Sequence, residues 1–441
     1  MPHFRVPEFH RGGGHHHHHG RHRWNRQRQL SRLILVVAAA IVIIAAGTVI
    51  WYRKRKARGY FRGGNAKENQ PSRHLQYIYP HAYTVEQALD TLNPLKFPTF
   101  QLNDGEFFIW DSMLPSREFG EALLQRGVTH MNAAKAKALG WTVPQGHRFG
   151  IMYRPAFQDF TPGNLAANQQ AIASFTSQFS PGAVDVLCLD LENEQLNDQY
   201  AGHAQALTAY ARTELGVKYV DFLGMQLVNV DFNVTGQPLS DTFFARYMRP
   251  VISWDDPLPY IQNAWLDTGD WLYSLVYVTD RVRNTDPALP QISFFWNRTV
   301  NGTMFIPEYV AHAYPLFVLF SGGKGLIAWY DNKPGISYAS DEGLIAGFHR
   351  ASQHNDIRRG KPEFITPEIS LDGGKTWIAN DAVTAKANRH PIVRICRNGS
   401  SHVVVGCNSI PGAQPMDVTF RCNTLTDTIR LEARKTYLGR K

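Results

Sequence analysis

The sequence predicts an α/β protein whose main domain is a (β/α)8 TIM barrel, followed by a C-terminal antiparallel β-sheet or sandwich domain and preceded by one transmembrane helix. Three observations lead to this prediction. Short apolar runs alternate with helical patterns over residues 76–358. In residues 359–441 the helical pattern stops, and strand-like runs follow one another between turns. Before residue 76, a segment without any charged residue is bordered by basic residues.

The first 75 residues contain three segments that differ in composition. Residues 1–32 are rich in Gly, His and Arg, so we expect a disordered basic tail there. Residues 33–51 are apolar and nearly as long as the roughly 20 residues that a membrane-spanning helix needs. A cleaved signal peptide is the alternative, but its apolar core is usually shorter. With residues 52–75 as a basic spacer, we expect a single-pass membrane protein whose main folded domain is extracytoplasmic.

The positive charge of the chain is confined to its beginning. The net charge is +9 over 441 residues, yet residues 1–62 alone hold thirteen Lys or Arg against a single Glu. The rest of the chain is therefore slightly acidic. Because nucleic-acid binding needs a basic surface, we expect no nucleic-acid partner for the folded part.

Strands are expected where apolar and aromatic residues run together between turns. The expected strands cover residues 97–102, 106–110, 147–155, 184–194, 218–226, 271–280, 291–297 and 324–332. For residues 271–280 a helix is the alternative. Up to eight strand–helix units fit into this region, which matches the size of a (β/α)8 barrel.

Helices are expected between most of these strands. They cover residues 116–125, 162–179, 200–215, 307–320 and 341–353, with another before residue 264. Ser116 can cap its helix and Gly127 can end it, while Pro162 and Pro307 suit a first turn. A doubly wound sheet is the competing fold, but no phosphate-binding glycine motif follows the first strand.

The C-terminal domain is expected to be rich in β-structure. Its short apolar runs are separated by Gly, Asn and Pro, which is typical of an antiparallel sheet or sandwich. Cys396, Cys407 and Cys422 lie close together in the sequence, so one disulfide can form among them.

One strand of the barrel region ends in several acids. In the run Val184–Glu194, alternation places Val186, Cys188, Asp190 and Glu192 on the same face. Active residues of (β/α)8 barrels come from the C-terminal ends of the strands, so Asp190 and Glu192 become candidates for catalysis.

Other expected strands also end in acids or aromatic residues. Asp280 is the third catalytic candidate. The substrate-binding candidates are Tyr153, Arg154, Tyr277, Trp296, Asn297, Trp329 and Asp331. Aromatic rings stack on the apolar faces of sugars, and paired carboxyl groups transfer protons and stabilise an oxocarbenium-like transition state, so this set favours a carbohydrate substrate.

The remaining polar residues give no sign of a metal or cofactor. His130, His147, His203 and His312 lack the spacing of metal ligands, and we expect neither a metal site nor a cofactor. Glu308 follows Pro307, where its charge would complement a helix N-terminus.

The acidic strand resembles a known family. Asp185-x-x-Cys188-x-Asp190-x-Glu192 is similar to the D-x-x-D-x-D-x-E strand of chitinase-like glycoside hydrolases, with Cys188 in place of the middle Asp. The run GLIAWYD, residues 325–331, looks like the last barrel strand of these enzymes, which ends in a substrate-stacking Trp. The resemblance implies that Glu192 is the proton donor and that Asp190 orients the acetamido group of the substrate. Tyr277 and Asp280 would then help to hold that group.

We therefore expect a membrane-anchored glycoside hydrolase that cleaves a poly- or oligosaccharide by carboxylate acid/base catalysis. Two alternatives stay open. A short tail, an anchor and a large outer domain also suit a type II glycosyltransferase, and Cys188 suits a non-catalytic carbohydrate-binding protein on a degenerate barrel.

Overall fold

The computed structural model describes a large part of the chain from Thr99 onward. The described residues are 99–112, 114–146, 149–153, 157–189, 198–222, 227–228, 234–235, 254–255, 263–285, 291–297, 306–329, 339–423 and 425–441. All of them belong to one unit, Tyr77–Lys441. The expected tail, transmembrane helix and spacer lie outside the described residues. Among the residues that are described, no helix is long and apolar enough to span a membrane.

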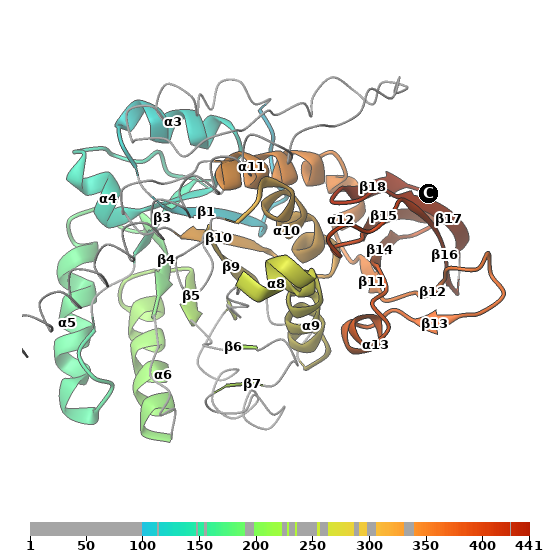
Figure 1. Cartoon of the computed structure of the whole chain (residues 1–441). Coiled ribbons are helices and arrows are strands. Elements are labelled where there is room, and N and C mark those ends of the chain that lie inside the picture. Colours follow the sequence, from blue (N-terminus) through green and yellow to red (C-terminus); the bar gives the residue numbers. More distant parts are fainter. Residues whose placement is uncertain are drawn as a thin grey trace, which may run out of the picture. The chain divides into compact units, whose positions relative to one another are not determined.

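Eight parallel strands form the largest sheet of the described chain (Figure 1). They are β1 (Phe107–Asp111), β2 (His130–Asn132), β3 (Gly150–Tyr153), β4 (Val184–Cys188), β5 (Tyr219–Phe222), β8 (Trp254–Asp255), β9 (Ile292–Trp296) and β10 (Gly325–Trp329). Their spatial order is β8-β5-β4-β3-β2-β1-β10-β9, with every neighbouring pair parallel. Two short strands, β6 (Leu227–Val228) and β7 (Val234–Thr235), pair separately.

The strand order is that of a TIM-like barrel. β1, the first strand, pairs with β10, the last, which joins the two ends of the series. The strands at the two edges of the sheet are β8 and β9. They follow each other along the chain among the strands of this sheet, and they contact each other. The predicted α/β class with a barrel-like sheet is thus confirmed.

Helices follow most of the strands in the described part of the chain. They are α3 (Arg117–Gln125), α4 (Ala133–Ala138), α5 (Leu165–Thr176), α6 (Asp198–Thr213), α8 (Asn263–Thr268), α9 (Asp270–Thr285), α10 (Glu308–Phe320), α11 (Ala339–Ser352) and α12 (Asn355–Arg358). The hydroxyl of Ser116 accepts a hydrogen bond from the backbone N of Phe119, so Ser116 caps α3 as expected. Pro162 begins a short 3-10 helix, Pro162–Asn164, that leads into α5.

Alternation along the strands creates two apolar layers. Residues of one parity form a cluster inside the curled sheet, namely Phe107, Ile109, Met152, Val186, Cys188, Ile292, Phe294 and Ile327. Residues of the other parity, such as Phe108 and Trp110 of β1, pack in the larger core that also includes the helices. Burial on both faces explains why these strands read as nearly continuous apolar runs.

Two helices pack unusually closely through glycines. A Cβ atom at Gly343 of α11 would lie 2.5 Å from the carbonyl oxygen of Glu308 on α10. A Cβ atom at Gly347 would lie 2.4 Å from the carbonyl oxygen of His312. The absence of these side chains lets the two helix backbones approach each other.

The C-terminal region is a β-sandwich, shown in orange and red in Figure 1. One sheet contains β11 (Glu363–Ile365), β14 (Ile392–Asn398), β15 (Ser401–Cys407) and β18 (Thr436–Arg440). The other contains β13 (Ile378–Ala379), β12 (Glu368–Ser370), β16 (Met416–Cys422) and β17 (Leu425–Leu431). Both sheets are antiparallel, and Val393, Val404, Val418 and Phe420 pack in one shared core.

Some expected elements differ from the observed ones. Residues 271–280 belong to helix α9, because the buried Trp271, Leu275, Val276 and Val282 recur at helical spacing. Residues 99–102, the described part of the expected strand 97–102, form no strand. β2, α4 and the helix α13 (Ala382–Ala387) were not expected. The possible disulfide does not form: all four cysteines of the chain lie in its described part, and none is in a disulfide.

Candidate functional site

Side chains from adjacent strands meet at the C-terminal end of the parallel sheet. Asp111, the last residue of β1, is in register with Trp329 of β10, and Trp329 is in register with Trp296 of β9. Two positions before each of them stands a residue of the interior cluster, namely Ile109, Ile327 and Phe294 respectively. Because side chains alternate along a strand, all three side chains point toward the inside of the sheet. An acid and two indole rings thus lie side by side at this end.

The two tryptophans form an aromatic surface. The ring centroids of Trp296 and Trp329 are 5.2 Å apart and the planes are inclined by 51°. Both side chains are half-buried. Phe294 supports Trp329 from inside the sheet, at a centroid distance of 6.3 Å. Such a surface suits contact with the apolar face of a ligand ring.

A buried polar cluster surrounds Asp111. Nδ2 of Asn132 donates a hydrogen bond of 2.6 Å to Oδ1 of Asp111. Nζ of Lys135 donates to the carbonyl oxygen of Asp111 at 2.6 Å and lies 3.5 Å from its Oδ1. Asp111 is only 3% exposed, and a buried charge needs a partner inside the protein. The ammonium group of Lys135 supplies the opposite charge.

The start of α4 places Asn132 and Lys135 for this role. Oδ1 of Asn132 caps the helix by accepting from the backbone N of Lys135 at 3.0 Å, which leaves the amide nitrogen for Asp111. Sequence reasoning missed all three residues. The signal was present for Asp111, because it is an acid directly after the apolar strand 106–110.

Asn297 is brought to the same end of the sheet. It follows Trp296, is 1% exposed, and its backbone oxygen accepts a hydrogen bond of 2.8 Å from Ile306. Among the residues that the structure describes, neither Oδ1 nor Nδ2 of Asn297 has a hydrogen-bond partner. An unsatisfied buried amide is costly, and a bound polar group or water would remove that cost.

Two acids occupy the first turns of the helices that follow β9 and β10. Burial raises the pKa of Glu308, at the start of α10, to about 7. Asp341, near the start of α11, is fully buried, and burial together with the charge of Glu342 raises its pKa well above the usual value. Glu308 was expected only to complement a helix N-terminus, and Asp341 was not expected at all.

Four of the predicted site residues lie outside the described residues: Asp190, Glu192, Arg154 and Asp331. The described chain of β4 extends through Cys188 to Leu189, both completely buried. Cys188 belongs to the cluster inside the curled sheet. Asp190 follows Leu189 directly in the sequence, and Glu192 comes two residues after Asp190.

Tyr153 faces away from the inside of the sheet. It packs against the core that contains the helices, and its ring stacks on Phe175 of α5 at a centroid distance of 3.6 Å and an angle of 2°. Burial raises the pKa of its hydroxyl. The parity of β3 places Met152, rather than Tyr153, among the interior residues.

Asp280 and Tyr277 do not lie at a strand end, so that expectation is wrong. Both belong to α9, where Asp280 contacts Arg283 at 3.0 Å and Arg394 of the β-sandwich at 2.7 Å. The hydroxyl of Tyr277 accepts a hydrogen bond of 3.0 Å from Arg281. The two residues line a hollow of about 750 Å³ together with Asp381 and Val383 near α13.

No metal centre is found among the described residues, since they contain no group of three or more His, Cys, Asp or Glu side chains arranged to hold an ion. Lys135, the cation beside Asp111, would repel one. The described residues at this end of the sheet present carboxyl groups, amides and aromatic surfaces.

The comparisons with known proteins found similar solved structures. No family model matches the chain, and no curated protein matches it. The chain is similar to a GH30 endoxylanase from Clostridium papyrosolvens, with 9% identity, TM-score 0.41, and coverage of 77% of this chain and 97% of the other. It is similar to domain 2 of a chitinase from Pyrococcus furiosus, with 8% identity, TM-score 0.40, and coverage of 57% and 97%.

A third similar structure is Amy13B from Eubacterium rectale, with 11% identity and TM-score 0.37. The match covers 62% of this chain and 64% of that one. Similar structures also include a lyase and a dehydratase. The TM-scores of these structures lie below 0.5, so the fold assignment above rests on the strands and their pairing. Glycoside hydrolases are among the structures to which this chain is similar.

Proposed function

We propose that the protein is a glycoside hydrolase whose active site lies at the C-terminal end of the parallel sheet. The observation that carries this proposal is the tryptophan pair, Trp296 and Trp329, beside the buried Asp111 on three adjacent strands. A barrel hosts many reactions, so the function has to come from such a site rather than from the fold. Indole rings and carboxyl groups together are the groups that bind and cleave a sugar chain.

The acids that follow β4 would perform the reaction. In this proposal Glu192 is the general acid and base, and Asp190 assists on the same side of the chain. The tryptophans would hold a sugar ring by stacking, while Asn297 would offer its unpaired amide to a substrate hydroxyl. Asp111, neutralised by Lys135, would keep the edge of the site polar without adding net charge.

The protein would act outside the cytoplasm. The support is the uncharged segment 33–51, flanked by basic residues in the sequence. We propose that it anchors the protein in a membrane as a single span. Retention of the full-length chain in the membrane fraction after alkaline carbonate washing would support the anchor, and release into the supernatant would contradict it.

A Glu192→Gln variant tests the hydrolase proposal. Wild-type protein is first screened on chromogenic aryl glycosides and on polysaccharides to find a cleaved substrate. On that substrate kcat should fall about 10²- to 10⁴-fold in the variant, because proton transfer is lost. Glu214→Gln, an exposed acid beyond the end of α6, is the matched control and should keep full activity. Full activity of a folded Glu192→Gln variant would refute the assignment.

One observation favours a second candidate function. Cys188 stands where the resembled motif has an acid, and it is completely buried inside the curled sheet, where it provides no carboxylate. A non-catalytic carbohydrate-binding protein would need only the tryptophan surface. Binding of a glycan without any turnover, lost on replacement of Trp329, would support this second candidate.

A further inference from the structure

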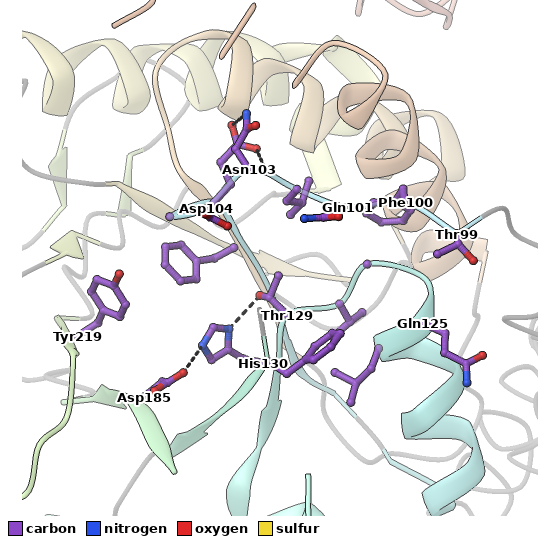
Figure 2. A pocket seen from close by; sticks show the side chains of 18 of the residues that line it. Thr99, Phe100, Gln101, Asn103, Asp104, Gln125, Thr129, His130, Asp185 and Tyr219 are labelled. Atoms are coloured by element: carbon purple, nitrogen blue, oxygen red, sulfur yellow. Dashed lines mark hydrogen bonds and ion pairs between the residues drawn. The ribbon is translucent and has the colours of Figure 1, made fainter. Parts of the chain in front are cut away.

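A cavity lies at the other end of the parallel sheet, away from the tryptophan pair. Figure 2 shows this cavity from close by. Its volume is about 610 Å³, and it is lined by the first residues of three strands: Phe107 of β1, His130 of β2 and Tyr219 of β5. These are N-terminal ends, whereas Asp111, Trp296 and Trp329 are C-terminal ends. Volumes of roughly 300–1,000 Å³ are typical of sites for small molecules.

A buried imidazole and a carboxylate meet in the wall of this cavity. Nε2 of His130 is 3.6 Å from Oδ2 of Asp185, as Figure 2 shows by a dashed line. His130 is 3% exposed, and among the described residues its Nε2 atom has no hydrogen-bond partner. The histidine is thus oriented toward the carboxylate but does not bond to it directly.

The hydrogen bonds of Thr129 favour a proton on Nδ1 of His130. Its hydroxyl accepts from the backbone N of Phe108 at 3.0 Å and donates to the carbonyl oxygen of Phe108 at 3.1 Å. The hydroxyl proton is therefore occupied, so Nδ1 of His130, 2.9 Å away, is the donor to Thr129. In the neutral imidazole Nε2 is then an acceptor. In this tautomer two acceptors, Nε2 and the Asp185 carboxylate, lie side by side.

Aromatic side chains form the wall next to these acceptors. The rings of Phe107 and Tyr219 contact edge to face at a centroid distance of 5.3 Å, and Phe107 lies 5.5 Å from the imidazole of His130. Phe149 also lines the cavity. A ligand with an apolar face beside hydroxyl groups would match both kinds of surface.

The charges around the cavity favour a neutral ligand. Nζ of Lys218 lies 3.5 Å from Oδ1 of Asp185 and offsets its charge. Glu106 is neutralised by Arg358, whose nitrogens donate to its oxygens at 2.8 and 2.9 Å. An anionic ligand would meet the oxygens of Asp185, and an ammonium ligand would meet Lys218. Adjacent hydroxyls of a sugar ring can donate to both acceptors without either conflict.

We propose that this cavity binds one neutral sugar ring through two adjacent hydroxyl groups that donate to His130 and Asp185. The site is separate from the proposed active site and does not depend on hydrolysis there. Tyr219 and Phe107 would pack against the apolar face of the ring, and Lys218 would donate to a further hydroxyl.

Saturation-transfer NMR with D-glucose as the probe tests the proposal on the full chain. Asp185→Asn should weaken binding about tenfold, because one of two acceptors becomes a neutral amide that also presents a donor. Because Trp329 would itself hold a sugar ring at the opposite end, the effect of Asp185→Asn is also measured in the Trp329→Ala background, where it should persist. Glucose 6-phosphate and glucosamine are the charged probes, and both should bind more weakly than glucose.

A second variant covers the case in which Asp185→Asn does not fold. A Cβ atom at Gly150 would lie 2.3 Å from Oδ2 of Asp185, so this carboxylate is closely packed. Lys218 is 54% exposed, and Lys218→Met should fold and still weaken glucose binding. Three results would overturn the proposal: no glucose binding by the wild type, loss of binding in Trp329→Ala only, or preference for either charged probe.

Discussion

Asp280 Oδ2 accepts a hydrogen bond of 2.7 Å from Arg394, whose side chain is completely buried. This contact joins α9 of the barrel region to β14 of the β-sandwich. Two further hydrogen bonds hold the guanidinium group, to the carbonyl oxygens of Asn380 and Val393, both at 2.8 Å. Asp280 supplies the negative charge that this buried cation needs.

Replacing Asp280 should therefore destabilise the protein. Asp280→Asn leaves the charge of Arg394 buried and unpaired, which we expect to lower the free energy of unfolding by about 3 kcal/mol. Urea denaturation followed by tryptophan fluorescence measures this change. Asp417→Asn, which breaks the exposed pair with Arg430, is the control and should leave the midpoint unchanged. Activity of the folded Asp280→Asn protein decides whether Asp280 has any part in the reaction.

Trp329→Ala should weaken substrate binding more than it slows the reaction. Loss of the indole removes a stacking surface, so KM should rise about tenfold, equivalent to ~1.4 kcal/mol. Steady-state kinetics on the substrate found by screening measure this. Trp377→Ala is the control, because Trp377 contacts Arg421 within the β-sandwich and should not affect KM. A fall in kcat at constant KM would contradict the role as a binding surface.

The stability of the protein should depend on the protonation of Glu308. Burial raises its pKa from 4.5 to about 7, so the folded state keeps the proton over a range in which the unfolded state has lost it. The stabilisation is full below about pH 4.5 and is lost as the pH rises through about 7. Glu308→Gln should remove this decline. Thermal unfolding of both proteins across that range measures the difference, and parallel pH profiles would contradict the prediction.

Gly347→Ala should destabilise the contact between α10 and α11. The new methyl group would lie 2.4 Å from a backbone oxygen, and we expect a loss of about 2 kcal/mol or more. Gly202→Ala in α6 is the matched control, since a Cβ atom there meets nothing within 4 Å. That variant should be slightly more stable, because alanine favours a helix over glycine. Chemical denaturation of the two variants gives the comparison.

Part of the candidate site follows from local sequence patterns. Trp296, Asn297 and Trp329 come directly after or at the ends of apolar runs, and the structure brings them to one end of the sheet. Tyr153 was expected there from the same pattern, yet its parity in β3 directs it to the helices. The neighbouring strands and helices decide which face of a strand points inside the sheet. A short apolar run in the sequence does not reveal which face that is.

The cluster of Asp111, Asn132 and Lys135 can be recognised only in the folded structure. The strand that carries Asn132 has only three residues, too few for a period to be visible in the sequence. Its partner Asp111 is 21 positions away, and only the pairing of β1 with β2 brings the two together.

The sequence by itself determined the alternation of strands and helices, the β-rich C-terminal region and the apolar strand that leads to Asp190, because periodicity and turn residues are local properties. The tertiary structure decided that residues 270–285 are a helix, that Asp280 binds Arg394, and that His130 meets Asp185 in a cavity. These relationships join residues far apart in the chain, and their energy comes from burial and charge pairing that exist only after folding.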